Sequence, residues 1–460
     1  RQRVCECTFE KSDHTCDLLR LAQSPTEHRT AARLTTRTIG KSEPPCVFGR
    51  PILACRACKM GDAHGQKKPC VCIVVENLPV PLDRRVWQES CALRDAGYEV
   101  IVICPQMQGY TQAEEKLDDI QIYRHPLSEE ANSVGGFFRE YASALFGEFR
   151  LLCKAWRRHR FDIIQLCNPP DILFLAAAPF KLAGVRLIYD VHDATPEMFE
   201  AKFGKRGLLY WAVRIAEWWT HFFADTVIAT NQSVRDIATG RGGQAAEDVF
   251  IVRSAPKIPT SKIEPDPDLK KGRKFLVGYV GVMGSADGIH RIIEAAHFLV
   301  TELGRADIRF LLMGFGPEYK NLVALRDELG LGDVVDLPGR VEGDALFSAL
   351  KTMDLGISGD PINAYNHHCT MNKVLEYMAV GKPQVTFDLK ESRYSAEDAA
   401  RYVGEVSSQA LGQAVADLLD DPETRERMGR IGQERFHAEL NWEKSVQQLE
   451  AAYAHTLGQA

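Results

Sequence analysis

A carboxylate and an ammonium group lie close together in the segment that runs from Thr370 to Pro383. Thr370 is a suitable N-cap, and Asn372, Lys373 and Glu376 then share one face of the helix that follows. On that face a carboxylate can accept both hydroxyls of a ribose, and a lysine can neutralise a diphosphate. A solvated Lys–Glu pair is the alternative interpretation.

A glycine-rich turn precedes this segment in the chain. Gly281-Val-Met-Gly284 follows an apolar run and leads into a helical pattern that starts at Ile289. Glycine lets the backbone approach a phosphate closely, and a helix N-terminus offers free N–H groups. Similar turns also occur without a ligand, so a phosphate site and a purely structural turn both stay open.

Two adjacent arginines mark the first half of the chain. Arg84 and Arg85 fall in the first turn of a helix that Asp83 is expected to cap. Cations at this end oppose the helix dipole, which favours anions there. The pair therefore predicts contact with an anionic ligand, such as a diphosphate or a phosphorylated acceptor. The alternative is pairing with Asp83 or Glu89.

His192 and Asp193 directly follow an expected strand, residues 186–190. A histidine or aspartate at the carboxyl end of a strand can orient a sugar or take a proton from an acceptor hydroxyl. The alternative is a helix cap at Asp193 beside a histidine without a role.

Repeated strand–helix–strand patterns must position these groups. The first series covers residues 68–255, and residues 256–273 carry four prolines and read as a linker. A second series covers residues 274–440, and the last segment, 441–460, predicts a helix that packs back on the first domain. We expect an α/β fold with two Rossmann-like, doubly wound domains that face each other across a cleft.

The motifs resemble those of the retaining glycosyltransferases of family four, which have the GT-B fold. The resemblance covers residues 70–455. Its donor motifs are the glycine-rich turn, Pro338-Gly-Arg340 and Asn372-Lys-x-x-Glu376-Tyr-Met-Ala-x-Gly-Lys-Pro. In the first half, the segment from Glu76 to Glu89, Asn168-Pro-Pro-Asp171 and His192-Asp193 resemble a bacterial branch that builds surface polysaccharides.

The resemblance implies a role for each matching residue. Glu376 would hold the ribose, while Lys373, Arg340 and the N–H groups near Gly281 and Gly284 would face the diphosphate. It also implies a glycan or polyprenyl-linked acceptor. A nucleotide-sugar would serve as co-substrate, with neither a cofactor nor a metal.

The chain departs from the family pattern at two places. Where the family commonly has the first glutamate of a Glu-x7-Glu pair, this chain has His368. Where its first glycine-rich loop often carries Arg and Lys, this chain has Val282 and Asp287. His367, His368 or Arg393 can take over these roles, and the sequence does not rank them.

Composition narrows the class of protein. The chain has 460 residues, 45% of them hydrophobic, and a formal net charge of −6. This balance does not suggest a nucleic-acid-binding protein, which shows a clustered basic excess. Without an apparent signal peptide or membrane span, we expect a protein of the cytoplasm or of the inner face of the membrane.

The N-terminal residues 1–67 differ from the rest and are interpreted as a disordered or non-native extension, with Met60 as the natural start. The alternative is a zinc site. Its ligands would come from Cys55, Cys58, His64, Cys70 and Cys72.

Two basic stretches with aromatic residues, 146–160 and 202–223, suit an anionic membrane surface. A buried aromatic face with a solvated basic side is the interpretation that we favour for each helix alone.

Sugar transfer to a glycan or lipid-linked hydroxyl, with retention of configuration, is the leading hypothesis. A nucleotide-sugar epimerase or hydrolase of the same fold, and a non-catalytic nucleotide- or glycan-binding protein, are the alternatives.

Overall fold

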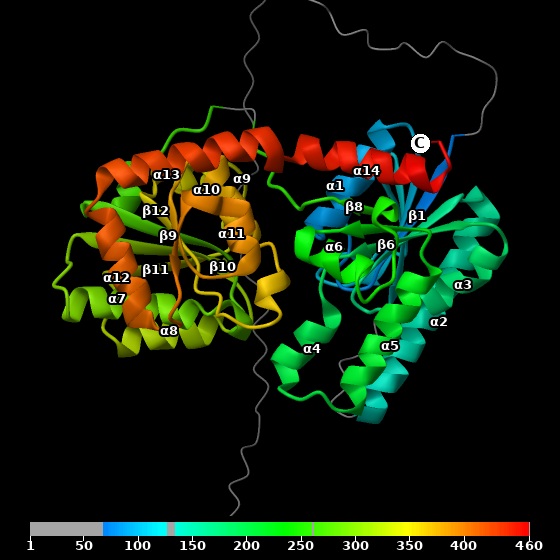
Figure 1. Cartoon of the computed structure of the whole chain (residues 1–460), viewed down its shortest axis with the longest axis horizontal. Helices are drawn as coiled ribbons and strands as arrows, with labels where there is room; N and C mark the ends of the chain where they lie inside the picture. Colours follow the sequence, from blue (N-terminus) through cyan, green and yellow to red (C-terminus); the bar gives the residue numbers. More distant parts are fainter. Residues whose placement is uncertain (1–67, 127–133, 260–261, 460) are drawn as a thin grey trace, which may run out of the picture. The chain divides into compact units, whose positions relative to one another are not determined.

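The computed structural model describes residues 68–126, 134–259 and 262–459, which lie in one compact unit, Gln66–Ala460. The expected Met60 start and the Cys55–Cys58 half of the zinc hypothesis lie outside the described residues. Two parallel sheets, each covered by helices, form two Rossmann-like domains (Figure 1). Among the described residues, no helix is both long and apolar enough to cross a membrane.

The first domain contains an eight-stranded sheet with the strand order β3-β4-β2-β1-β5-β6-β7-β8. All neighbouring strands are parallel except β3 and β4, which pair antiparallel at one edge. The strands are β1 (Cys70–Val75), β2 (Glu99–Gln106), β3 (Glu114–Leu117), β4 (Ile120–Pro126), β5 (Ile163–Cys167), β6 (Arg186–Val191), β7 (Thr226–Ala229) and β8 (Val249–Ile251).

Both faces of this sheet are buried, because successive side chains of a strand point to opposite sides. In β1, Cys70, Cys72 and Val74 pack against α2 and α3, while the intervening residues pack against α1 and the C-terminal helix α14. The helices of this domain are α1 (Arg84–Asp95), α2 (Val134–His159), α3 (Phe174–Leu182), α4 (Thr195–Phe203), α5 (Leu208–Phe223) and α6 (Gln232–Thr239). Cys70 and Cys72 are thus apolar core residues, and this half of the zinc hypothesis is wrong.

The second domain contains a fully parallel sheet with the order β11-β10-β9-β12-β13-β14. The strands are β9 (Phe275–Val282), β10 (Ile308–Phe315), β11 (Val335–Gly339), β12 (Leu355–Ile357), β13 (Gln384–Phe387) and β14 (Ala400–Val403). The helices are α7 (Ile289–Thr301), α8 (Tyr319–Glu328), α9 (Gly343–Thr352), α10 (Asn372–Ala379), α11 (Lys390–Ala396), α12 (Ser408–Leu419) and α13 (Pro422–Arg435).

The chain passes between the domains twice, through the segment after β8 and through the end of α13. A π-helical turn, Phe436–Leu440, links α13 to α14 (Trp442–Thr456), drawn in red in Figure 1. Helix α14 packs against β7, β8 and α1, and buries Leu449 and Tyr453 in the core of the first domain. The last helix therefore contributes to the domain from which it is most distant in sequence.

Three strands, β3, β4 and β14, were not anticipated from the sequence. Strand β3 has the sequence Glu-Glu-Lys-Leu and forms the polar edge of its sheet, where burial imposes no hydrophobic pattern. Strand β14, with Arg401 and Tyr402 at its centre, is likewise an edge strand.

Candidate active site

The glycine-rich turn lies at the topological switch point of the second sheet. The chain continues from β9 to β10 and β11 on one side, whereas β12, β13 and β14 lie on the other. Ligands of such sheets bind in the crevice outside the carboxyl ends of the strands at this point. Gly281 is the second-last residue of β9. Ser358, Gly359 and Asp360 directly follow β12.

Two glycines make a close approach possible here. Gly281 has φ +154°, and a Cβ there would lie 2.8 Å from Tyr279 Oη and 3.3 Å from Lys373 Cε. Gly288, which caps α7, has φ +67°, and a Cβ there would lie 1.9 Å from the carbonyl oxygen of Gly359. Only glycine accommodates both the backbone angle and the contact at Gly288. The N-terminus of α7 is thereby held against the end of β12.

Lys373 lies beneath this turn and is buried. Its Nζ is 2.7 Å from Asp360 Oδ2 and 5.2 Å from the centre of the Tyr279 ring. Burial alone would lower the pKa of Lys373, but the Asp360 carboxylate outweighs burial and the pKa is raised. The interpretation of a solvated Lys373–Glu376 pair is wrong, because both side chains are buried and Lys373 pairs with Asp360.

Glu376 lies one helical turn later on α10 and faces the first domain. Its Oε1 is 3.6 Å from Nη1 of Arg84, which is 64% exposed. Burial raises the pKa of Glu376, and the charge of Arg84 opposes that effect. The two domains thus place an exposed cation from α1 beside a buried carboxylate of α10.

Arg85 occupies a different environment from Arg84. It is buried beneath α1, where it pairs with Asp190 at 2.7 Å and with Glu89 at 3.0 Å, and donates to the carbonyl oxygen of Val252 at 2.8 Å. The predicted contact with an anionic ligand is therefore wrong for Arg85, and the alternative of pairing with Glu89 is correct. Neighbouring positions on a helix point about 100° apart, so one arginine faces solvent and the other faces the sheet.

His192 and Asp193 follow β6 at the carboxyl edge of the first sheet. His192 Nε2 lies 2.8 Å from Asp190 Oδ2. Burial alone would lower the pKa of His192, but Asp190 outweighs burial, so the pKa is raised. Asn168 Oδ1 accepts hydrogen bonds from the backbone N–H groups of His192 (2.7 Å) and Asp193 (3.2 Å), which fixes the loop.

Asp193 joins the two domains rather than capping a helix. Its Oδ1 accepts a hydrogen bond of 2.7 Å from Tyr365 Oη. Helix α4 starts at Thr195 with Ala194 as its N-cap, so the interpretation of Asp193 as a cap is wrong. Thr370 also differs from expectation, because Met371 precedes α10 and Thr370 Oγ1 accepts from Asn231 Nδ2 of the first domain at 3.1 Å.

The remaining predicted residues are less well placed for a ligand. Arg340 is exposed and its Nε donates to Glu342 at 2.7 Å, while Asn372 is exposed at the start of α10. The N–H group of Gly284 donates to Asp287 Oδ2 at 2.9 Å, so this donor already has an acceptor. The departure from the family pattern at Asp287 therefore changes the local chemistry of the loop.

His368 lies in the loop before α10. Its Nδ1 is buried without a hydrogen-bond partner in the described part of the chain, and burial lowers its pKa. The His368 carbonyl oxygen accepts from Asn231 Nδ2 at 2.7 Å. The imidazole is therefore neutral near pH 7 and can accept or donate one proton, but it does not replace the missing glutamate as an anion.

Several residues that organise the site were missed by the sequence analysis. Asp360 could have been found, because it follows a buried strand and the small residues Ser358 and Gly359. Tyr365 and Asn231 carry no local signal, since each acts through a partner in the other domain.

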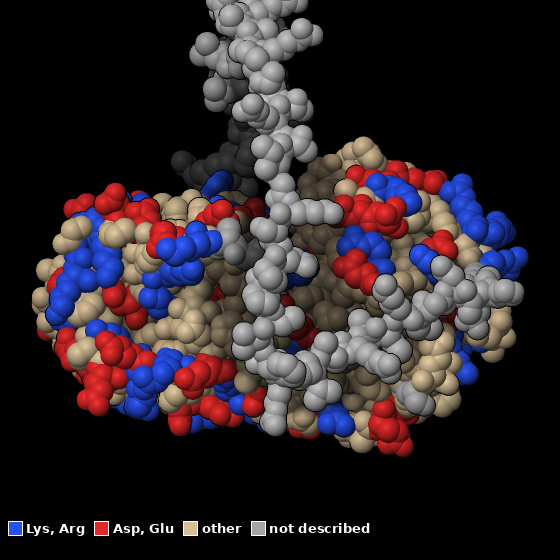
Figure 2. Space-filling view, turned by 90° about the horizontal axis from the view of Figure 1, so that it is seen from above, with Lys and Arg blue, Asp and Glu red and all other residues tan. Residues whose placement is uncertain are grey.

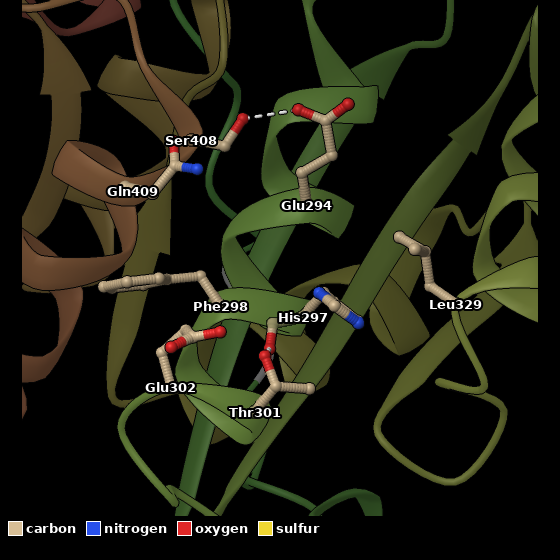
Figure 3. Close-up of a pocket in the computed structure, with 8 residues that line it drawn as sticks. All are labelled: Glu294, His297, Phe298, Thr301, Glu302, Leu329, Ser408 and Gln409. Carbon is tan, nitrogen blue, oxygen red and sulfur yellow. Dashed lines mark hydrogen bonds between the residues drawn. The ribbon is translucent and has the colours of Figure 1, made fainter.

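A hollow of about 250 Å³ between α7 and α12 lies away from this site (Figure 3). Its lining includes His297 and Phe298, and Ser408 Oγ donates to Glu294 Oε2 at 2.5 Å across it. None of its lining residues belongs to the predicted donor set, so we assign it no part in the reaction.

In the part of the chain that the structure describes, two clusters contain the side-chain types that bind metals. In one, Asp190 and His192 bond each other, and Asp190 also receives Arg85 and Gln165, so its charge is already compensated. In the other, His125 Nε2 lies 3.1 Å from Glu76 Oε2, beside the buried Glu148. The pKa of Glu148 is raised well above its usual range by burial and by Glu76, which favours the neutral acid over the anion that a metal would need. A reaction without metal or cofactor stays a prediction.

The charge distribution agrees with a small-molecule enzyme. Figure 2 shows acidic and basic side chains interspersed on the face in view, rather than one continuous basic stripe. Nucleic-acid binding proteins present such stripes along their phosphate contacts.

The fold and these features define a protein of the GT-B architecture, with two Rossmann-like domains and groups from both at one site. Two family profiles match in tandem: "Glycosyl transferase 4-like domain" over residues 82–252 and "Glycosyl transferases group 1" over residues 261–435. The chain is a glycosyltransferase of the GT-B type, and hence a sugar transferase.

Known relatives agree with this assignment. An uncharacterized glycosyltransferase of Methanocaldococcus jannaschii is 20% identical over 78% of this chain and 90% of its own length. The alpha-D-kanosaminyltransferase of Streptomyces kanamyceticus is 32% identical, over 33% of this chain and 38% of its own.

Solved structures show the same fold. Sucrose-phosphate synthase from Thermosynechococcus elongatus has a TM-score of 0.69 at 16% identity, covering 85% of this chain and 100% of its own. HepE of Anabaena, in complex with UDP-glucose, has a TM-score of 0.62 at 17% identity, and the match covers 84% of this chain and 99% of HepE.

Proposed function

We propose that the protein moves a sugar from a nucleoside-diphosphate sugar to a hydroxyl of a glycan or lipid-linked acceptor. The anomeric configuration is retained, and the product serves cell-surface polysaccharide synthesis. The observation that carries the donor half is the placement of Lys373, Glu376 and the Gly281 turn together at the switch point of the second sheet.

Glu376 is the proposed ribose anchor. A buried carboxylate that faces an exposed, loosely held partner is suited to exchange that partner for two hydroxyl donors. In the structure the partner is Arg84, whose side chain is mostly exposed and contacts Glu376 only at 3.6 Å. On donor binding, Arg84 would leave Glu376 for the diphosphate, and both groups would then keep a charged or hydrogen-bonding partner.

The leaving diphosphate is the group whose charge grows during sugar transfer. Preorganised N–H groups and cations that face this charge contribute most to catalysis of such reactions. We assign this role to Arg84 and to the backbone N–H groups near Gly281. Lys373 supplies a fixed positive potential from below, although Asp360 compensates part of its charge.

His192 is proposed to act as a hydrogen-bond donor. The raised pKa that Asp190 imposes favours the imidazolium form, which is a poor general base. A protonated His192 at the carboxyl edge of the first sheet can instead donate a hydrogen bond to a sugar hydroxyl or to the carbonyl oxygen of a substrate amide. Asp193, bound to Tyr365, would orient the acceptor between the domains.

The donor and acceptor classes draw support from the relatives. HepE is described in complex with UDP-glucose, and another relative is a kanosaminyltransferase, so nucleotide-sugars are the first ligands to test. The resemblance of the first half to enzymes of surface-polysaccharide synthesis supports a glycan or polyprenyl-linked acceptor. We place the reaction in the cytoplasm, at the inner face of the membrane.

A thermal-shift screen against nucleoside diphosphates and nucleotide-sugars tests the donor half, because a ligand that binds only the folded state raises the Tm. We expect one nucleotide-sugar to raise the Tm more than the corresponding monophosphate. A well-folded protein with no shift in any of them would contradict the proposal and favour a non-catalytic role.

The best donor is then incubated with and without candidate acceptors. Product that forms only with an acceptor supports the transferase, and NMR of its anomeric proton tests retention. Free sugar or an epimerised donor that forms without acceptor would instead identify a hydrolase or an epimerase.

A further inference from the structure

Helix α5 has its polar and apolar faces reversed relative to an ordinary surface helix. Its buried residues include Glu217, Thr220 and His221, which are polar. Thr220 Oγ1 donates to the carbonyl oxygen of Asp171, and Glu217 pairs with Arg241 at 2.7 Å. The inner side of α5 is thus held largely by hydrogen bonds and ion pairs, and apart from Tyr210 and Phe223 its large apolar residues remain outside.

The exposed side carries a concentrated apolar surface, which we call the α5 face. Of the 16 large hydrophobic residues that are exposed among the described residues, eight lie between positions 203 and 222. Scattered exposed hydrophobics are normal in proteins, whereas a contiguous group marks an interaction surface. The members of the α5 face are Phe203, Leu208, Leu209, Trp211, Ile215, Trp218, Trp219 and Phe222.

The aromatic members of the α5 face contact one another. The Trp218 and Phe222 rings stack with centroids 5.6 Å apart, and Trp218 meets Trp219 edge to face at 5.1 Å. These rings therefore form a continuous apolar surface despite exposures of 39–63%. The expectation of a buried aromatic core face in this stretch is wrong for these three residues.

The charges beside the α5 face are mostly positive, although Arg206 pairs with the partly exposed Glu200 of α4 at 2.8 Å. Lys202 is exposed in the last turn of α4, and Lys205 and Arg206 are exposed in the turn between α4 and α5. Between residues 201 and 223 the only acidic residue is Glu217, which is buried and paired with Arg214 and Arg241. Tryptophan and phenylalanine beside the exposed Lys202 and Lys205 are complementary to an anionic lipid surface.

We propose that the α5 face docks on an anionic phospholipid bilayer and lies in its interface. The helix covers 16 residues, or about 24 Å, and is too short and too polar on its inner side to span a membrane. Helix α4 directly follows the His192–Asp193 loop, so a bilayer at the α5 face would hold the acceptor side of the site near the lipid surface. This inference rests on the proposed function only where it explains how a lipid-linked acceptor is reached.

Vesicle binding by the full chain, without donor or acceptor, tests the proposal independently of catalysis. Protein is sedimented with phosphatidylcholine vesicles and with vesicles that also contain phosphatidylglycerol. We expect binding to the anionic vesicles, a blue shift of tryptophan fluorescence because three of the six tryptophans lie on the α5 face, and weaker binding at high salt.

Two sets of variants separate the apolar and charged contributions. The triple variant Trp211→Ser, Trp218→Ser, Phe222→Ser is expected to lower vesicle affinity by at least about tenfold, since each buried aromatic contributes substantially. The triple variant Lys202→Glu, Lys205→Glu, Arg206→Glu is expected to abolish the preference for anionic lipid. The control for the serine variant is a double variant of exposed apolar residues in the second domain, Leu303→Ser with Val406→Ser. The control for the glutamate variant is a triple variant of exposed cations in that domain, Lys320→Glu, Arg427→Glu and Arg430→Glu.

Equal binding to neutral and anionic vesicles, or no binding by a folded wild-type protein, would overturn the proposal. A wild-type dimer in sedimentation that the serine variants convert to monomer, without vesicle binding, would assign the α5 face to a second copy. The donor thermal shift is measured on the same variants. If the wild-type protein shows the donor thermal shift but does not bind vesicles, only the membrane inference is overturned. If the wild-type protein shows no donor thermal shift, the proposed function is contradicted instead.

Discussion

Tyr365 of the second domain donates a hydrogen bond of 2.7 Å to Asp193 of the first, which joins the loop before α10 to the loop after β6. Asp193 neighbours His192, and the Tyr365 loop leads into the helix that carries Lys373 and Glu376. The bond therefore connects the proposed acceptor side of the site to the proposed donor side. Closure of the two domains around substrates must preserve this bond or exchange it for a substrate contact.

Removal of the Tyr365 hydroxyl should reduce catalysis more than stability. We expect Tyr365→Phe to lower kcat/KM by about tenfold, because one hydrogen bond that holds the domains is lost, at a stability cost of about 1 kcal/mol. Steady-state kinetics and thermal melting measure the two effects. Tyr319→Phe is the matched control, since Tyr319 donates a bond of equal length, 2.7 Å, to Leu337 within one domain. Equal kinetics in the two variants would contradict the role of Tyr365.

Glu376 should determine affinity for the donor. Glu376→Gln keeps the shape but removes the charge that accepts the ribose hydroxyls, and we expect affinity for the nucleotide-sugar to fall by at least about tenfold, or 1.4 kcal/mol. Calorimetric titration provides the measurement. Glu302→Gln, on the outer helix α7, is the control. Unchanged affinity in folded Glu376→Gln protein would show that the donor site is assigned to the wrong residues.

Activity should depend on pH through His192. Its pKa is raised above the ordinary value near 6.5 by Asp190, so the imidazolium form persists to a higher pH than in a free histidine. If His192 acts as a donor, kcat/KM falls as the pH rises through this raised pKa. His192→Gln, which cannot titrate, should be less active and lose this limb of the pH profile, while Asp190 keeps its bonds to Arg85 and Gln165. A profile with the same limb in the variant would assign the titration to another group.

Glu148 should make the protein less stable as pH rises. Its pKa in the folded state lies well above the ordinary value of 4.5, so the folded state binds more protons than the unfolded state above pH 4.5. Stability is therefore greatest below that pH and declines as the pH rises toward the folded-state pKa. Glu148→Gln mimics the protonated acid, and we expect it to weaken this decline in denaturant titrations between pH 4.5 and 8.

The same variant tests the prediction that no metal is needed. Metal analysis of the purified wild-type protein should find no stoichiometric ion, and chelation should leave the Tm unchanged. One equivalent of a divalent metal in the wild type, lost in Glu148→Gln, would show that a cation rather than a proton joins Glu148, Glu76 and His125.

The sequence by itself determined the alternation of strands and helices, the two-domain fold, the cap at Asp83 and the donor segment around Lys373 and Glu376. These features follow from local chemistry, because hydrophobic period, glycine at tight turns and capping residues act over a few positions. The sequence did not determine which of Arg84 and Arg85 faces the site. The two residues are identical in type and adjacent on the helix, so only the surrounding tertiary structure distinguishes them.

Tertiary structure alone decided three features: the pairing of Lys373 with Asp360, the bond from Tyr365 to Asp193, and the outward direction of the aromatic residues of α5. An amphipathic pattern gives the period of a helix but not which face is buried. In α5 the inner face is chosen by partners far away in sequence, Asp171 and Arg241, which bind Thr220 and Glu217. The physical reason is that burial of a polar group is favourable only where hydrogen-bond partners meet it, and those partners come from the fold.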